Sequence, residues 1–278
     1  MVASKSGERT ERSQSINGRI VPLEQSEERV IREDANGKVT EKIVRRFNQT
    51  GELTSTERVV TDEQKRPGGG TSSHRITYRS DVNGGMKEDE RVAIETRSQG
   101  AVTYTDTIIQ RPDINGSFAT SEKRKVVSET SGSTTHTDDT FYRKSPNGDF
   151  SEAVRKVSDV QKTGDTVVSK TANYEPGDTG QLQLKSQSVS TSTTRPDGSE
   201  TTEVSLYTNA AEGRTEESGG RQYIREQQVI ERRPGPGGAV IETLSVRRPI
   251  LSDPTRLGSL RQVSETVCKG KCTSDGKP

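Results

Sequence analysis

Polar and apolar residues alternate along most of the chain, and uninterrupted apolar runs are short. The longest runs have three residues, as in Val92-Ala93-Ile94. Segments such as 38–47 (KVTEKIVRRF) and 101–109 (AVTYTDTII) are rich in the β-branched residues that favour strands. Alternation with a period of two is typical of strands, and the many Gly and Pro residues between segments oppose helices. The pattern therefore predicts a chain of strands and turns.

Turn glycines recur at a nearly fixed interval, which indicates an internal repeat. Successive members lie 32 or 33 residues apart, and four of them follow Asn. An Asn-Gly pair between strand-like segments predicts a tight type I′ hairpin turn. The glycines are Gly18, Gly51, Gly84, Gly116, Gly148, Gly180 and Gly213.

A second turn falls near the middle of each repeat, for example at Gln99-Gly100 and Thr163-Gly164. Each repeat then has two strands. We predict an all-β fold, a long antiparallel β-meander of hairpin repeats that forms an extended or superhelically twisted sheet. Open twisted sheets rarely exceed about 10 strands without curling. A two-layer sheet and a closed up-and-down barrel are therefore the alternatives.

The repeat phase divides the chain into four parts. Residues 1–18 resemble the second half of a repeat, either as an edge strand or as part of a longer, exported protein. Residues 19–213 hold six hairpin repeats, residues 214–260 hold degenerate repeats with longer loops, and residues 261–278 form a C-terminal hairpin cap and tail.

Charged and aromatic residues also keep the phase of the repeat. An Arg stands five residues before several turn glycines and a Glu six residues after them, which predicts cross-strand ion pairs. The predicted pairs are Arg46 with Glu57, Arg79 with Glu90, and Arg111 with Glu122. Tyrosines six residues before the glycines are expected on the opposite face, and both faces are expected to mix polar and apolar residues. These tyrosines are Tyr78, Tyr142, Tyr174 and Tyr207.

Composition narrows the classes of function. Only 25% of the 278 residues are hydrophobic and 4% are aromatic, whereas 31 are Ser and 33 are Thr. Such a chain cannot form a core of normal size, and the apolar wall of a catalytic pocket is not expected. The net charge of +1 gives no field that would attract nucleic acid. No apolar run approaches the length of about 20 residues that a membrane-spanning helix needs.

Residues that could carry chemistry are few. His74 and His136 show no metal-ligand spacing, and no catalytic residue, metal or cofactor is predicted. Acidic turns such as Pro112-Asp113-Ile114-Asn115-Gly116 offer oxygen ligands for calcium, but Asp, Asn, Pro and Gly are also ordinary turn residues. We favour the turn interpretation.

The two cysteines are the sharpest local feature. Cys268 and Cys272 flank Lys269-Gly270-Lys271, and a central glycine favours a tight loop. We predict a Cys268–Cys272 disulfide, which requires an oxidising compartment. Two free thiols are the alternative.

Together these features predict a non-enzymatic structural or interaction repeat protein that presents an elongated polar β-surface. We expect a cell-envelope or extracellular location, although no signal peptide is visible. The expected partners are a polymer, a cell surface, or copies of the chain joined by sheet-edge pairing. One alternative is a glycan- or peptide-binding β module that uses Tyr78, Tyr142, Tyr174 and Tyr207. Another is an intrinsically disordered polyampholyte.

Overall fold

The computed structural model describes residues 7–16, 19–81, 83–145, 147–209, 222–250 and 252–268. Every regular element among the described residues is a strand except one short 3₁₀ turn, η1, at Pro236–Gly238. The strands are β1 (Glu8–Ile16), β2 (Arg19–Glu33), β3 (Gly37–Phe47), β4 (Leu53–Lys65), β5 (Thr71–Ser80), β6 (Met86–Gln99), β7 (Val102–Pro112), β8 (Phe118–Ser131), β9 (Thr134–Lys144), β10 (Phe150–Thr163), β11 (Thr166–Pro176), β12 (Leu182–Thr194), β13 (Glu200–Thr208), β14 (Tyr223–Pro234), β15 (Val240–Arg247), β16 (Pro249–Ile250), β17 (Asp253–Leu257) and β18 (Arg261–Cys268).

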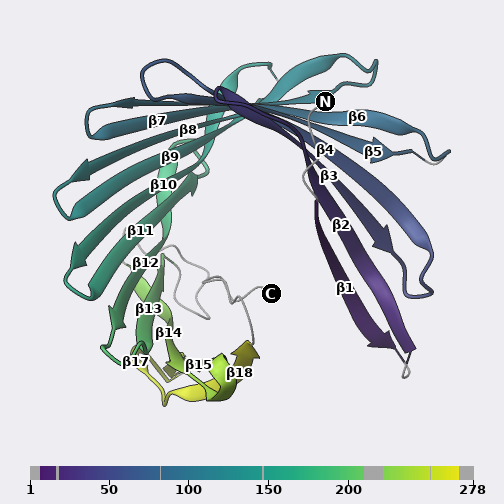
Figure 1. Ribbon diagram of the computed structural model, residues 1–278. Helices are drawn as coiled ribbons and strands as arrows, with labels where there is room; N and C mark the ends of the chain where they lie inside the picture. Colours follow the sequence, from purple (N-terminus) through teal and green to yellow (C-terminus); the bar gives the residue numbers. More distant parts are fainter. Residues whose placement is uncertain are drawn as a thin grey trace. The chain divides into compact units, whose positions relative to one another are not determined.

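The strands form an antiparallel meander, as the sequence predicts (Figure 1). Sixteen strands follow one another in chain order from β1 to β15 and then β18, while β16 and β17 pair separately as a short ribbon. Strands β1 and β18 stand at opposite ends of this order. The hydrogen-bonded ladder is therefore not closed, and the barrel alternative is wrong.

The chain divides into two compact units. The first comprises the residues up to Val127 together with Phe141–Ser151, and the second comprises Ser128–Thr140 and the residues from Glu152 onward. In each unit the extensive contacts join strands that are neighbours in the sheet, and the ribbon β16–β17 additionally contacts β14. Each strand is thus stabilised mainly by the strands beside it, as in other repeat arrays.

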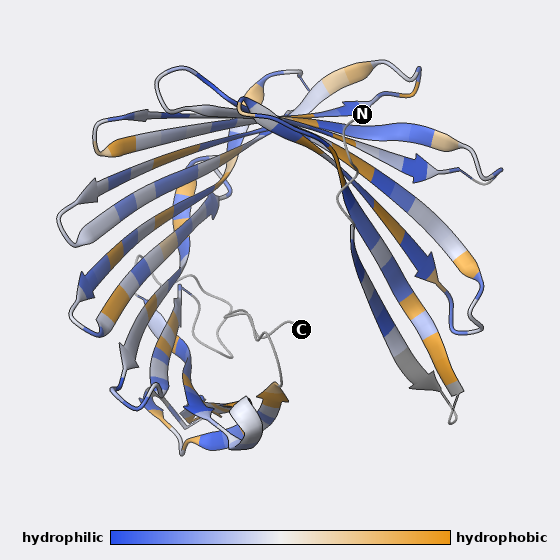
Figure 2. Ribbon diagram, viewed as in Figure 1, coloured by the Kyte–Doolittle hydropathy of each residue, from blue (hydrophilic) through white to orange (hydrophobic). Residues whose placement is uncertain are grey.

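The two faces of the sheet are both mixed, which confirms the prediction from the repeat phase. Val44 lies on the same face as Arg46, whereas Ile43 lies on the opposite face with Glu41, because successive side chains of a strand alternate. Figure 2 shows hydrophobic and hydrophilic positions interspersed along the strands. Among the described residues no large side chain is fully buried, and the buried apolar residues are Val21, Val44, Val92 and Ala239. The core is thin and spread along the array.

The described glycines near the repeat boundary form a different turn from the one predicted, while Gly18 and Gly213 lie outside the described residues. Gly116 N–H donates to Asp113 O at 3.0 Å, and Asp113 N–H donates to Ser117 O at 2.9 Å. Three residues therefore connect the strands, and the last of them, Gly116, has a φ of 81°. This is a type I turn followed by a left-handed glycine rather than a two-residue type I′ turn. The Asn-Gly signal located the turn correctly but gave the wrong type.

Several mid-repeat turns have two residues instead. Gln99 pairs with Val102 and Thr163 pairs with Thr166, which leaves two residues in each loop. Gly100 and Gly164 occupy the first loop position with φ values of 60° and 58°. Positive φ at this position is what the hairpin-compatible two-residue turns require. Other mid-repeat connections have three residues, since Arg66 N–H donates to Gly70 O and Arg195 N–H donates to Ser199 O, both at 2.7 Å.

Candidate interaction surface

A row of alternating charges crosses one face of the first unit. Arg46 contacts Glu24 on the preceding strand at 3.2 Å and Glu57 on the following strand at 3.8 Å. Arg111 repeats this arrangement with Glu90 and Glu122, both at 3.1 Å. The pairs Arg46–Glu57 and Arg111–Glu122 are those that the sequence predicts. We call this feature the Arg–Glu row; its members are Glu24, Arg46, Glu57, Arg79, Asp89, Glu90, Arg111 and Glu122.

The middle arginine of the row departs from the prediction. Arg79 contacts Glu57 at 3.3 Å and Asp89 at 3.2 Å. Glu90 contacts Arg75 at 3.4 Å and Arg111. The cause is a register shift between β5 and β6, where Tyr78 pairs with Glu88 and Thr77 with Glu90. This bulge inserts Asp89 beside Arg79, so the expected Arg79–Glu90 pair is wrong.

The opposite face of the same strands holds a buried carboxylate. Glu41 on β3 is only 3% exposed. It accepts hydrogen bonds of 2.6 Å from Nε of Arg29 on β2 and of 2.6 Å from Nε of Arg58 on β4. Burial on its own would raise the pKa of Glu41, but the bonds from Arg58 and Arg29 outweigh it and lower the pKa. The sequence reasoning missed this cluster; the only signal is an acidic residue at the centre of an otherwise strand-forming segment.

Tyr78 extends this cluster to the next strand. Its ring lies 5.3 Å from the Arg58 guanidinium, as measured to the ring centroid, and it pairs in register with Arg58. Arg79 pairs with Glu57 on the face of the Arg–Glu row, so Tyr78 lies on the opposite face, as predicted. Tyr78 is half-buried and packs under a cation. Its surroundings are those of a cross-strand packing residue.

The other candidate tyrosines are placed as follows. Tyr174 pairs with Arg155 and Leu184, and Tyr207 pairs with Gln187 and Ile224. Following the register through Gln187 puts Tyr174 and Tyr207 on one face, two strands apart. Tyr142 is half-buried on β9. A common surface for all four tyrosines stays a prediction.

The two histidines are both exposed strand residues. His136 Nδ1 lies 2.7 Å from Oδ1 of Asp159 on the neighbouring strand, and Arg155 pairs with Asp138 beside it at 2.5 Å. His74 pairs in register with Asp62 and Ala93. Where the chain is described, no group of three or more His, Cys, Asp or Glu residues is placed to hold a metal ion.

The acidic turns use their carboxylates locally. Asp113 Oδ1 accepts the N–H groups of Asn115 at 2.8 Å and Ser117 at 2.9 Å. Asp81 does the same for Asn83 and Gly85, and these backbone bonds lower the pKa of Asp81. The carboxylates therefore act as ordinary turn residues, in agreement with the turn interpretation.

Cys268 is the last residue of β18, and Cys272 lies outside the described residues. The predicted Cys268–Cys272 disulfide therefore also lies outside them.

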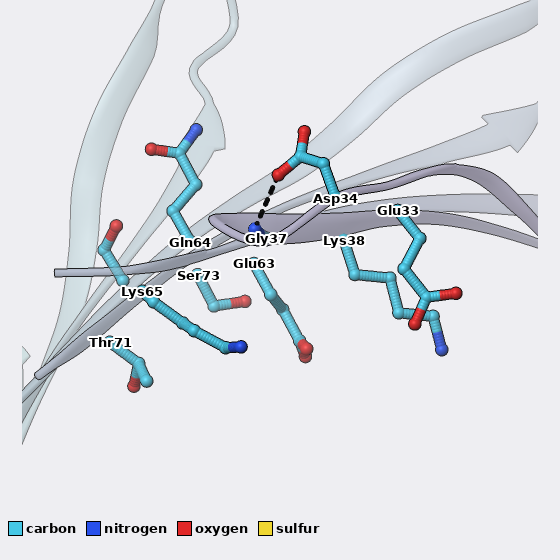
Figure 3. Close-up of a pocket in the computed structure, with 10 residues that line it drawn as sticks. Glu33, Asp34, Gly37, Lys38, Glu63, Gln64, Lys65, Thr71 and Ser73 are labelled. Carbon is cyan, nitrogen blue, oxygen red and sulfur yellow. Dashed lines mark hydrogen bonds between the residues drawn. The ribbon is translucent and has the colours of Figure 1, made fainter. Parts of the chain in front are cut away.

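A shallow hollow of about 430 Å³ lies at the mid-repeat end of β2–β5. Figure 3 shows the side chains of Lys38, Glu63 and Lys65 on one side of the sheet and that of Gln64 on the other. The register puts Lys38 between Glu33 on β2 and Glu63 on β4. Positive and negative groups therefore alternate here as they do in the Arg–Glu row. The hollow offers hydrogen-bonding groups without a strong excess of either charge.

Comparison of the chain with protein families, with characterised proteins and with solved structures gives no match. The part of the chain that the structure describes contains no helix long and apolar enough to cross a membrane.

Proposed function

We propose that the protein is a non-enzymatic repeat protein of the cell envelope or extracellular space, which presents an elongated polar β-surface to an extended partner. The observation that carries the proposal is the Arg–Glu row. Arg46 and Arg111 each contact carboxylates on both neighbouring strands. Charges on this face are thus neutralised within the sheet, and the surface suits a long partner with neutral polar groups better than a highly charged one.

Cross-strand hydroxyl pairs support a surface built for hydrogen bonding. Thr96 and Thr105 oxygens lie 3.2 Å apart, and those of Ser158 and Thr171 lie 3.0 Å apart. Similar pairs recur on other neighbouring strands, between β1 and β2 in the first unit and at several places in the second unit. Because each hydroxyl can donate and accept, such pairs can also bind a polymer that carries hydroxyl or amide groups.

The open ends of the strand order support self-association as one form of this function. Strands β1 and β18 each have one neighbour in the order. β1 carries Glu8, Arg9, Glu11 and Arg12, and charged side chains on an edge oppose indiscriminate pairing. Selective pairing with another copy therefore requires a partner edge whose charges are complementary, with opposite charges facing each other.

The envelope or extracellular assignment rests on sequence features. The Ser and Thr content, the repeat and the predicted Cys268–Cys272 disulfide support it. Detection of the disulfide by mass spectrometry of the protein isolated from its native source tests this assignment. A chain with two free thiols there would contradict it.

Binding to an extended partner can be tested with the full chain and an internally shortened one. Pull-down on insoluble polysaccharides and cell-wall preparations, with sedimentation velocity for self-association, should show binding that weakens when two strands are removed. A shortened chain of residues 1–84 joined to 117–278 keeps the turn sequence Asn-Gly-Ser at the junction. Failure to bind any extended partner, or binding independent of repeat number, would contradict the proposal.

The glycan- or peptide-binding alternative depends on the tyrosines. Tyr174 and Tyr207 on one face of the second unit favour it, whereas the stacking of Arg58 on Tyr78 favours a packing role. A variant with Tyr78, Tyr142, Tyr174 and Tyr207 all changed to Ser separates the two on a glycan array. Unchanged binding excludes the tyrosines as a binding stripe. The extensive strand structure of the described residues argues against the disordered alternative.

A further inference from the structure

A pocket in the second unit differs from the rest of the sheet surface. It has a volume of about 530 Å³, within the range of about 300–1,000 Å³ that is usual for small-molecule sites. It lies where the ribbon β16–β17 contacts β14 instead of continuing the meander between β15 and β18. The bond from Gly258 N–H to Arg248 O, at 2.8 Å, closes the base of this ribbon.

The floor of the pocket is a register row across three strands. Gln228 on β14 pairs with Val246 on β15, and Val246 pairs with Arg261 on β18, so the three side chains share a face. Leu244, two residues before Val246, lies on the same face. Ile250 of the ribbon adds an apolar wall. The pocket thus combines an apolar interior with a guanidinium at the edge strand.

Apolar surface at the pocket is left open to solvent. Val263, which stands at the register shift of β18, is 63% exposed, and Ile250 is 39% exposed. Both line the pocket. A ligand with an apolar body would cover this surface, and burial of apolar area is worth roughly 25 cal/mol per Å².

The charges around the pocket leave one cation without a partner. Hydrogen bonds from Gln228 and Arg248 lower the pKa of Glu226, so Glu226 is ionised and neutralises Arg248 at 2.7 Å. Arg247 also lines the pocket, but the register turns its side chain to the other face, where its Nε donates to Gln227 at 2.5 Å. Arg261 makes no ion pair or hydrogen bond with another side chain in the described part of the chain. A guanidinium binds a carboxylate through two parallel hydrogen bonds.

We propose that this pocket binds a small monocarboxylate with an apolar body, with its carboxylate on Arg261 and its body over Val246, Ile250 and Val263. A carboxylate attached to an apolar body is found both in a short fatty acid and at the C-terminus of a peptide that ends in an apolar residue. This site is distinct from the Arg–Glu row, because it lies in the second unit, in a half-open pocket between the ribbon and strands β14, β15 and β18.

Octanoate and N-acetyl-Ala-Leu serve as the two carboxylate probes, and octanamide and N-acetyl-Ala-leucinamide as their neutral counterparts. Binding to the full chain is followed by calorimetry and by amide chemical shifts. At least one acid should bind at about 1 mM or below, and its amide should bind about tenfold more weakly or worse, because a charged hydrogen bond is lost. Binding of octanoate would identify a fatty acid as the ligand type, and binding of N-acetyl-Ala-Leu would identify a peptide C-terminus. Equal binding of acid and amide, or no binding of either acid, would overturn the proposal.

Two variants and one control test the residues. Arg261→Gln should weaken binding of the acid by about tenfold and leave binding of the amide unchanged. Arg233→Gln, at an exposed residue of β14 that does not line the pocket, should change neither. Gly258→Leu should block binding of both acid and amide, because Gly258 lines the pocket and a leucine side chain would fill it. The backbone accommodates the change, since an added Cβ there meets only ordinary contacts with Arg248 O at 3.4 Å and Ile250 Cγ1 at 3.9 Å. Far-UV circular dichroism checks each fold. Acid binding that survives Arg261→Gln undiminished would exclude the site, even if Gly258→Leu failed to fold.

Discussion

Arg58 on β4 donates its Nε–H to Oε1 of Glu41 on β3 at 2.6 Å, and Glu41 is one of the few side chains of the described sheet that is almost fully buried. Arg29 donates to the other oxygen of the same carboxylate from β2. One acidic side chain therefore links three consecutive strands. Removing a partner of such a carboxylate, or its charge, leaves buried polar groups without full compensation.

Glu41→Gln should lower the free energy of unfolding of the first unit by about 1–3 kcal/mol, since one amide oxygen cannot accept from both arginines as a carboxylate does. The matched control is Glu27→Gln, an exposed carboxylate on neighbouring β2, on the same face as Glu41. Hydrogen exchange of the amides of β2–β4 measures the effect locally. Equal exchange rates in both variants would contradict a stabilising role for Glu41.

The same carboxylate predicts a pH dependence. Its pKa is lowered in the folded protein, so its contribution to stability is complete above the unfolded-state pKa of about 4.3. The contribution is lost as the pH falls through the lowered folded pKa. Stability of the wild type should decline below about pH 4.3 more steeply than that of Glu41→Gln, measured by denaturant titration. Parallel pH profiles would contradict the assignment.

Arg111→Gln should show coupling of about 0.5 kcal/mol to each of Glu90→Gln and Glu122→Gln in double-mutant cycles. Arg111 contacts both carboxylates at 3.1 Å, but it is 48% exposed, so solvent screens the pairs. The coupling should shrink in 1 M salt, where screening acts over about 3 Å. Glu129→Gln, at an exposed residue of β8 that is not a member of the row, provides the uncoupled control.

Changing either of two glycines to Ala should lower the stability of the fold, for a different physical reason at each position. Gly116 has a φ of 81° with no atom within 4 Å of an added Cβ, so Gly116→Ala should cost about 1 kcal/mol from backbone strain alone, and Asn there should cost less. At Gly37 an added Cβ would lie 2.1 Å from the carbonyl oxygen of Glu63. Gly37→Ala should therefore cost more and disturb the β3–β4 pairing. Thermal unfolding of both variants compares them; a larger loss for Gly116→Ala would contradict this.

Deleting residues 85–116 should leave a folded protein with two fewer strands. The deletion removes β6 and β7 together, so β8 takes the direction of β6 beside β5 and the ladder can continue. Circular dichroism per residue should be unchanged, and the denaturant dependence of unfolding should fall with the smaller surface. Deleting only residues 85–100 reverses the strand direction and should disrupt the sheet. Equal tolerance of both deletions would contradict a repeat of two strands.

The sequence by itself determined the strands, the two-strand repeat and the positions of the turns. Glycine spacing and β-branched residues are local signals, and local backbone preferences decide where a chain extends and where it reverses. The same phase located the pairs Arg46–Glu57 and Arg111–Glu122, because opposite residues of a hairpin follow from the turn position.

The tertiary structure decided what depends on exact register and on contacts that join more than two strands. The bulge between β5 and β6 moved Arg79 from Glu90 to Asp89, and an inserted residue of this kind leaves no mark in the glycine spacing. Turn type changed because Asp113 closes a three-residue loop with its own side chain. The Glu41 cluster and the pocket beside Arg261 arise where side chains from three strands meet, and the alternation within one strand does not specify such a meeting.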